Sequence, residues 1–183
     1  MMSPQRILII ALLTQGGLVA LSWWCSRLLD LPPRWGDPIR DGSIGIVVAL
    51  GLAVANYLLL TRAPGTWVVN GVRSAYRETI VPLFGGLHPA GAIVIGAAAG
   101  LGEEWLFRGI LQPLVGLIAS SVVFGVAHVG GRRMLAFGAW ATGMGLVMGG
   151  LAIATGGLIA PIVAHGLYDM LALEYIRRGA QRT

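Results

Sequence analysis

Long apolar runs separated by short gaps constrain this chain more than any other feature of its sequence. The first run, residues 7–29, exceeds the roughly 7–15 residues of a signal-peptide core and lacks a small-residue cleavage site in the expected place. Of the 183 residues, 56% are hydrophobic and only 11% are charged, whereas a soluble domain carries roughly 25% charge. We therefore predict one transmembrane domain that covers residues 1–183.

Six of these runs are candidates for helices that cross a bilayer, because about 20 residues at 1.5 Å each cover its hydrocarbon core. Pro113, Gly130-Gly131 and Gly156-Gly157 mark the breaks between the later runs. The stretch 62–87 is expected to be interfacial or partly re-entrant. We predict an all-α, polytopic membrane protein with about six transmembrane helices around a polar intramembrane cavity. The expected spans are residues 7–29, 43–61, 89–114, 117–129, 134–154 and 158–176.

Arginine is the only basic residue type besides histidine, and most of the 13 arginines lie in the gaps between the apolar runs. Cytoplasmic loops of membrane proteins carry an excess of positive charge. With a cytoplasmic N-terminus, the cytoplasmic side receives Arg6, Arg62, Arg73, Arg77, Arg132, Arg133, Arg177, Arg178 and Arg182, and the other side receives Arg27, Arg34 and Arg40. Six spans with both termini in the cytoplasm fit this asymmetry. No nucleic-acid partner is expected, since that would need a clustered basic face on a soluble fold.

Glu103, Glu104 and Arg108 interrupt the third apolar run. An ionisable side chain at membrane depth costs at least about 2.5–3.5 kcal/mol, so such residues mark functional or tightly paired positions. Residues four apart share a helix face, so Arg108 is expected to pair with Glu104 and to leave Glu103 without a counter-ion on another face. Desolvation makes such a carboxylate a stronger proton acceptor, as a general base requires. A protonated, hydrogen-bonded structural glutamate is the alternative.

Two further apolar runs carry the remaining candidate residues. His128 ends the fourth run, with Phe124 one turn earlier, and His165 and Asp169 lie four apart in the sixth. Taken singly, these residues are also compatible with a helix-end histidine and a local His–Asp hydrogen bond. Polar groups on several membrane helices converge in the bundle interior, because lipid contact would leave each without partners. The combined set predicts a polar cavity that can activate water and cleave an amide.

The predicted depths of Glu103 and His128 differ. Arg132 and Arg133 follow His128 so closely that His128 should lie near the cytoplasmic surface, whereas Glu103 should lie deeper if its helix starts at Pro89. We therefore expect that helix to begin about one turn later, after a re-entrant lead-in, so that the two residues can meet in the cytoplasmic half.

Three motifs together resemble the signature of the CAAX-protease and bacteriocin-processing family of intramembrane endopeptidases. They are Glu103-Glu104-x-x-x-Arg108, Phe124-x-x-x-His128 and His165-x-x-x-Asp169, in this order. The resemblance covers about the last hundred residues of the chain, and we place the catalytic core at about residues 89–176. The family commonly has asparagine where Asp169 stands, and this leaves open whether Asp169 is a neutral donor or a charged acceptor.

The resemblance implies a catalytic or orienting role for each of these charged and imidazole side chains. Glu103 would be the base that activates water, assisted by His128. His165 and Asp169 would polarise the scissile carbonyl or stabilise its oxyanion. The remaining glutamate and arginine of the first motif would orient these groups.

A metal-dependent mechanism is the alternative chemistry, because two histidines and a carboxylate are also the ligand set of several zinc hydrolases. His128, His165 and either Glu104 or Asp169 could hold zinc, with Glu103 as base. The two histidines come from different helices, however, and no H-E-x-x-H motif sets their geometry. The expected pairing of Glu104 with arginine would also remove one ligand. We favour a metal-free, glutamate-dependent mechanism and keep zinc as the alternative.

The predicted function is an intramembrane endopeptidase that hydrolyses a peptide bond of a membrane-associated peptide or protein. Eukaryotic members of the family trim prenylated C-terminal tails, whereas the absence of lysine favours a prokaryotic inner membrane and a bacteriocin-like precursor or sorting signal as substrate. The bilayer and this substrate are the expected partners. Ser120 and Ser121 leave a serine nucleophile open. A non-proteolytic binding or immunity scaffold and a proton-coupled carrier are the non-protease alternatives.

Overall fold

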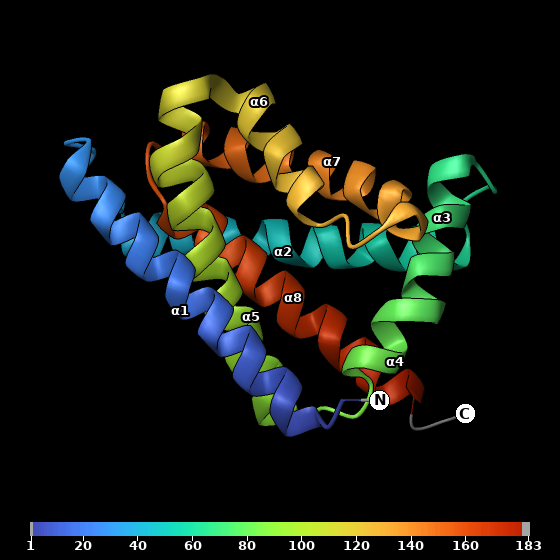
Figure 1. Ribbon diagram of the computed structural model, residues 1–183. Coiled ribbons are helices and arrows are strands. Elements are labelled where there is room, and N and C mark those ends of the chain that lie inside the picture. Colours follow the sequence, from blue (N-terminus) through green and yellow to red (C-terminus); the bar gives the residue numbers. More distant parts are fainter. Residues whose placement is uncertain (1, 181–183) are drawn as a thin grey trace.

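The computed structural model describes residues 2–180, and within this range the chain forms helices and connecting loops without strands (Figure 1). The predicted all-α, polytopic class is confirmed for these residues. Among the described residues, five helices are long and apolar enough to cross a membrane, where about six spans were expected. The difference lies at residues 89–127, which count as one helix. The five helices are Pro4–Leu28, Pro38–Thr61, Pro89–Ala127, Arg132–Thr155 and Ile159–Gly179.

Residues 89–127 nevertheless run through the bundle twice, because the chain reverses at Gly116. Helix α5 (Pro89–Glu104) continues through the π-helical turn η2 (Trp105–Leu111) into α6 (Gln112–Ala127). Gly116 has a φ of 84°, a conformation that favours glycine, and Figure 1 shows α6 turning back alongside the bundle. The break predicted at Pro113 is wrong, since proline fits the first turn of a helix.

The first two helices begin at capped prolines. Helix α1 (Pro4–Leu28) follows the N-cap Ser3. Helix α2 (Pro38–Thr61) begins before the predicted position 43, because the Asp37 carboxylate accepts hydrogen bonds from the backbone N–H groups of Ile39 and Arg40. Such a cap followed by proline satisfies the free N–H groups of the first turn.

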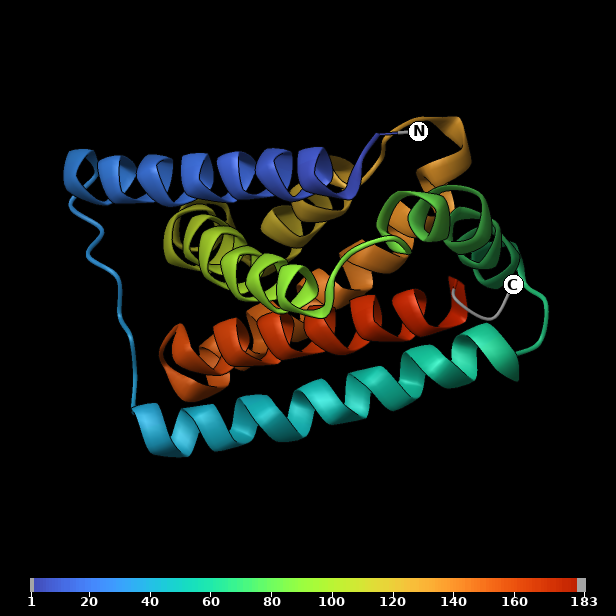
Figure 2. The same cartoon turned by 90° about the horizontal axis from the view of Figure 1, so that it is seen from below.

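A short helical segment connects α2 to α5 at the end of the bundle where both described termini lie (Figures 1 and 2). It contains α3 (Trp67–Ala75), the π-turn η1 (Tyr76–Ile80) and α4 (Val81–Phe84). Arg73 anchors it by donating hydrogen bonds of 2.8–3.0 Å to two backbone carbonyls at the C-terminal end of α2 and to one in the loop that follows. This segment is not among the five candidate spans.

The loops gather at two opposite ends of the bundle. At the first end, α3 packs against the start of α7 (Leu135–Thr155) and against the 3-10 turn η3 (Arg132–Met134). At the second end, the loop after α1 accepts hydrogen bonds at Trp35 from Leu158 and Ile159, where α8 (Ile159–Ala180) begins. The described chain therefore makes six passes, with both of its ends on the same side. Arg182 of the predicted charge count lies outside the described residues.

Helix α8 lies at the centre and packs closely against both α5 and α2. A Cβ atom on Gly100 of α5 would lie only 2.6 Å from the Ile162 carbonyl oxygen of α8. The glycine- and alanine-rich face of α5 thus meets α8, which allows the two backbones to approach closely. This approach brings the glutamates at the end of α5 next to His165.

The outer surface is strongly apolar. Leu13 on α1 is 72% exposed, Val47 on α2 is 70% exposed and Ile118 on α6 is 73% exposed. A surface of this kind is stable against acyl chains rather than water. Together with the long apolar helices, it identifies an integral membrane protein.

Candidate functional site

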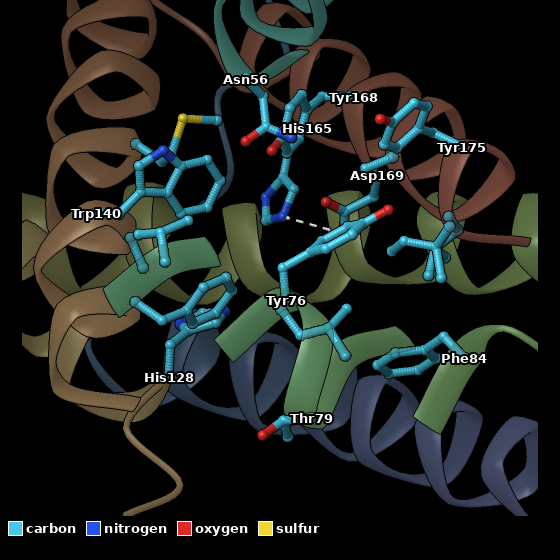
Figure 3. Close-up of a pocket in the computed structure, with 18 of the residues that line it drawn as sticks. Asn56, Tyr76, Thr79, Phe84, His128, Trp140, His165, Tyr168, Asp169 and Tyr175 are labelled. Atoms are coloured by element: carbon cyan, nitrogen blue, oxygen red, sulfur yellow. Dashed lines mark ion pairs between the residues drawn. The ribbon is translucent and has the colours of Figure 1, made fainter. Parts of the chain in front are cut away.

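A cavity of about 370 Å³ lies among α2, the α3–α4 segment, α7 and α8, and most of the sequence-predicted site residues line one part of it (Figure 3). Glu103, His128, His165 and Asp169 form this polar part. Figure 3 shows His128 and His165 on different helices facing the same space. The rest of the wall is largely apolar and includes Tyr76, Ile80, Phe84, Phe137, Trp140 and Met148.

Glu104 lies behind the cavity wall and is completely buried. Its Oε1 atom is 2.6 Å from His165 Nδ1, and its Oε2 atom is 3.1 Å from Arg108 Nε. Because the arginine pairs with the carboxylate, Glu104 accepts the proton of Nδ1 and thereby directs His165 Nε2 into the cavity. Arg108 also donates to the Gly145 carbonyl, at 3.1 Å, and its guanidinium lies 4.7 Å from the Phe124 ring centre.

Glu103 points in a different direction, as expected for the neighbouring position on a helix. Its Oε2 atom lies 3.8 Å from His128 Nε2 and 3.9 Å from His165 Nε2. Both distances are too long for a direct hydrogen bond, but a water molecule can hydrogen-bond to atoms at this separation and bridge them. Oε2 is buried and has no hydrogen-bond partner among the described residues. It is therefore the oxygen available to a water molecule or substrate.

The orientation of His128 follows from its backbone contact. Its Nδ1 atom lies 2.7 Å from the Phe124 carbonyl oxygen, and its ring packs 4.5 Å from the Phe124 ring. A carbonyl oxygen only accepts hydrogen bonds, so Nδ1 carries a proton. In the neutral imidazole, Nε2 then presents a lone pair toward Glu103.

Asp169 lies on the other side of His165. Its Oδ2 atom is 3.5 Å from His165 Nε2, and 30% of its side chain is exposed. Each of the six residues predicted from the three motifs thus lies within 4 Å of at least one other member of the set.

Glu103 and His128 meet because they lie at similar distances along the chain from the turn at Gly116. Glu103 precedes the turn and His128 follows it by nearly the same number of residues. At 1.5 Å per residue, both therefore lie about 20 Å from the end of the bundle where the turn lies. The expected later start of the third helix is wrong, since α5 begins at Pro89. The short α6 arm stops partway along the bundle and removes the predicted mismatch in depth.

The π-helical turn η2 starts directly after the two glutamates and includes Arg108. Single π-turns inside α-helices occur frequently at functional sites. Arg108 still reaches Glu104, the partner that the spacing of four residues predicted.

Gln15 of α1 also belongs to the site, although no role was predicted for it from the sequence. Its Nε2 atom donates a 2.7 Å hydrogen bond to Glu103 Oε1. Gln15 is the only amide side chain in the first apolar run. That isolation was the signal that could have pointed to it, because a polar side chain in a membrane helix faces the bundle interior.

Ser120 and Ser121 do not line the cavity. Both hydroxyl groups donate to the Leu117 carbonyl oxygen of their own helix, at 3.1 and 2.7 Å. Their positions give no support to the serine nucleophile that the sequence left open.

The metal-dependent alternative requires a set of side chains placed to bind the ion. Within residues 2–180, no three histidine, cysteine, aspartate or glutamate side chains are arranged so that they could hold a metal ion. Glu104, one of the predicted ligands, is engaged by Arg108 and His165.

These features define a class of protein: an α-helical integral membrane protein with glutamate, histidine and arginine side chains clustered beside a largely apolar cavity. Residues 85–171 match the model of the family described as type II CAAX prenyl endopeptidase Rce1-like. The matched segment contains all three motifs, which confirms the predicted resemblance. The family indicates a CAAX-type intramembrane endopeptidase in general terms. No curated protein and no solved structure matches the chain.

Proposed function

We propose that this protein is an intramembrane endopeptidase that cleaves a peptide bond with a water molecule activated by Glu103 and His128. The observation that carries the proposal is the position of Glu103 Oε2, which faces the Nε2 atoms of both His128 and His165 and has no hydrogen-bond partner among the described residues. A general base needs this combination of burial, accessibility and a neighbouring imidazole.

In the proposed reaction, Glu103 takes a proton from the water while His128 Nε2 accepts a hydrogen bond from it. The water oxygen attacks the scissile carbonyl carbon and forms a tetrahedral intermediate. His165, as the imidazolium, donates through Nδ1 to Glu104 and through Nε2 to the oxyanion. Glu103 then passes its proton to the amide nitrogen, the C–N bond breaks and a carboxylic acid and an amine are released.

Asp169 would act through His165 in this scheme. A bare carboxylate would repel the developing oxyanion, so direct contact requires the protonated form of Asp169. Its distance of 3.5 Å from His165 Nε2 allows it to orient the imidazole before substrate binds. Arg108 would hold Glu104 in place, since Glu104 lies on the side of His165 away from the substrate.

The largely apolar wall of the cavity supports a substrate with a hydrophobic side chain or lipid group next to the cleaved bond. We propose a membrane-associated peptide or protein tail as substrate and residues 89–176 as the catalytic core of a single domain. The arginine-rich end that holds both described termini would face the cytoplasm of a prokaryotic cell.

The test is cleavage of fluorogenic peptides, with and without a prenylated C-terminal tail, by the full chain in liposomes. We expect Glu103→Gln, which is nearly isosteric, to lower cleavage by about 10²–10⁴-fold, as typical for loss of a general base. Glu174→Gln is the matched control, because Glu174 pairs with Arg177 and Arg178 and does not line the cavity.

Unchanged cleavage by Glu103→Gln would contradict the proposal. A folded wild-type protein that binds these peptides without cleaving them would instead identify a non-proteolytic binding protein. The same assay with a zinc chelator separates the two chemistries: we expect no loss of activity, and a loss restored by zinc would establish the metal alternative.

A further inference from the structure

We infer that Gln15 is a positioning residue that holds Glu103 in the orientation needed for water activation, an inference that rests on the proposed function. Gln15 lies on α1, outside the segment 85–171 that matches the family. Its Nε2 atom nevertheless donates a 2.7 Å hydrogen bond to Glu103 Oε1 across the helix interface.

This hydrogen bond distinguishes the two oxygen atoms of Glu103. Oε1 is held by Gln15, while Oε2 faces the two imidazole groups without a hydrogen-bond partner among the described residues. A carboxylate oxygen only accepts, so the amide must present its NH₂ group to it. Gln15 thereby fixes the rotation of the carboxylate and leaves one defined oxygen for water.

The chemical type of Gln15 suits this task. Lysine or arginine at this position would form an ion pair with Glu103 and make it a weaker base. A neutral amide supplies a directional donor and leaves the negative charge in place. Gln15 thus differs from Arg108, which pairs with the orienting carboxylate of Glu104.

Helices α1 and α5 approach each other closely at Gln15. A Cβ atom on Gly102 would lie 2.8 Å from Gln15 Oε1 and 3.0 Å from the Gln15 carbonyl oxygen, so α1 can lie against α5 here only because residue 102 is glycine. The Oε1 atom of Gln15 is buried and has no partner among the described residues. This arrangement costs stability that a leucine would not cost, which argues for a role beyond packing.

A second contact joins α1 to η2, the direct continuation of α5. Trp105, at the start of η2, donates through Nε1 to Ser26 Oγ of α1 at 3.2 Å. Gln15 and Ser26 lie on the same side of α1, because eleven residues complete about three helical turns. Helix α1 is therefore held against the segment that carries Glu103 at two points.

The experiment compares Gln15→Leu, Gln15→Glu and the control Thr14→Val, which changes an exposed neighbour on α1. For Gln15→Leu we expect kcat for peptide cleavage to fall by about 10–100-fold with little change in KM, because a misplaced catalytic group slows the chemical step. For Gln15→Glu we expect the rising limb of the pH–rate profile to move to higher pH. The added carboxylate disfavours the ionised Glu103, so the base becomes available only at higher pH.

Wild-type kcat and an unchanged pH profile in both variants would overturn the inference. A lower thermal stability without a change in kcat or in the pH profile would also overturn it and leave a structural role. If Gln15→Leu does not fold, Gln15→Glu, which has nearly the same shape, carries the test.

A measurement of stability, which does not depend on catalysis, tests the contact separately from the proposed function. Thermal unfolding of Gln15→Leu, Glu103→Leu and the double variant measures the coupling of the two residues. We expect the effects of the two single variants on stability to be clearly non-additive. This result would establish the contact between Gln15 and Glu103 even if the wild-type protein cleaved no peptide and the protease function were rejected. Additive effects would overturn the contact itself, whatever the activity.

Discussion

Two adjacent glutamates have different surroundings because neighbouring positions on a helix face different directions. Glu104 is completely buried, with an arginine on one oxygen and a histidine on the other. Glu103 is 13% exposed and reaches the cavity. Glu104 is therefore a carboxylate held in place by two partners, whereas one oxygen of Glu103 faces the cavity.

At the scale of single residues, we predict that Arg108→Met strongly destabilises the protein. Removing one partner of a buried ion pair costs about 3–5 kcal/mol, and in this variant Glu104 keeps only His165 as a partner. Thermal unfolding in detergent should show a markedly lower Tm, and the double variant Glu104→Gln/Arg108→Met should recover part of it. Arg178→Met is the control, since Arg178 is 69% exposed and its pairing with Glu174 contributes little. Equal losses in Tm for Arg108→Met and Arg178→Met would contradict this prediction.

The lengths of the helices bring residues that are far apart in the sequence to the same depth in the bundle. The turn at Gly116 separates two helical segments, α5–η2 before it and α6 after it, and their lengths place Glu103 opposite His128. Contact between the glycine-rich face of α5 and the backbone of α8 then places Glu104 beside His165. The site depends on the distance between α5 and α8, which a single methyl group can change.

At the scale of helices, we predict that Gly100→Ala destabilises the protein by roughly 1–3 kcal/mol, as is typical when an atom is forced into a packed interface. Its Cβ would lie 2.6 Å from the Ile162 carbonyl oxygen, so the two helices must separate. We expect peptide cleavage to fall as well, because Glu104 and His165 lie on these two helices. Gly143→Ala on α7 is the control, since a Cβ there meets no atom of the described chain within 4 Å. A wild-type Tm for Gly100→Ala would refute the tight contact.

The whole molecule has an arginine-rich end and an arginine-poor end, which follows from its six passes. The arginine-rich end carries both described termini, the α3–α4 segment and the loop before α7. The other end carries Arg27, Arg34 and Arg40. This asymmetry agrees with the excess of positive charge that is typical of the cytoplasmic side.

At the scale of the molecule, we predict that both termini face the cytoplasm. In a Cys25→Ala background, a membrane-impermeant thiol reagent applied to intact cells should label Pro32→Cys, in the loop after α1. It should label Ser3→Cys and Gly179→Cys only after the membrane is permeabilised. Labelling of the two terminal positions in intact cells would reverse the orientation, and labelling of only one of them would contradict an even number of passes.

Much of the fold could be predicted because it depends on local properties of the chain. The apolar runs predicted the helices to within a few residues at most ends, and Gly131 and Gly156 break the chain where expected, each with a positive φ. The pairing of Arg108 with Glu104 followed from the four-residue spacing. The expected spans left a break between residues 114 and 117, where Gly116 lies, but the break was attributed to Pro113, because proline is the stronger breaker in sequence although it is compatible with a first helical turn.

The helical membrane class, the three motifs and the side chains that share a helix face can be inferred without coordinates. These follow from backbone hydrogen bonding within each helix and from its period of 3.6 residues. Three contacts of the site could be established only from the packing of the helices: His165 with Glu104, Glu103 with both histidines, and Gln15 with Glu103. These contacts join helices that are far apart in the chain, and they depend on how closely the backbones approach and at what depth each side chain lies.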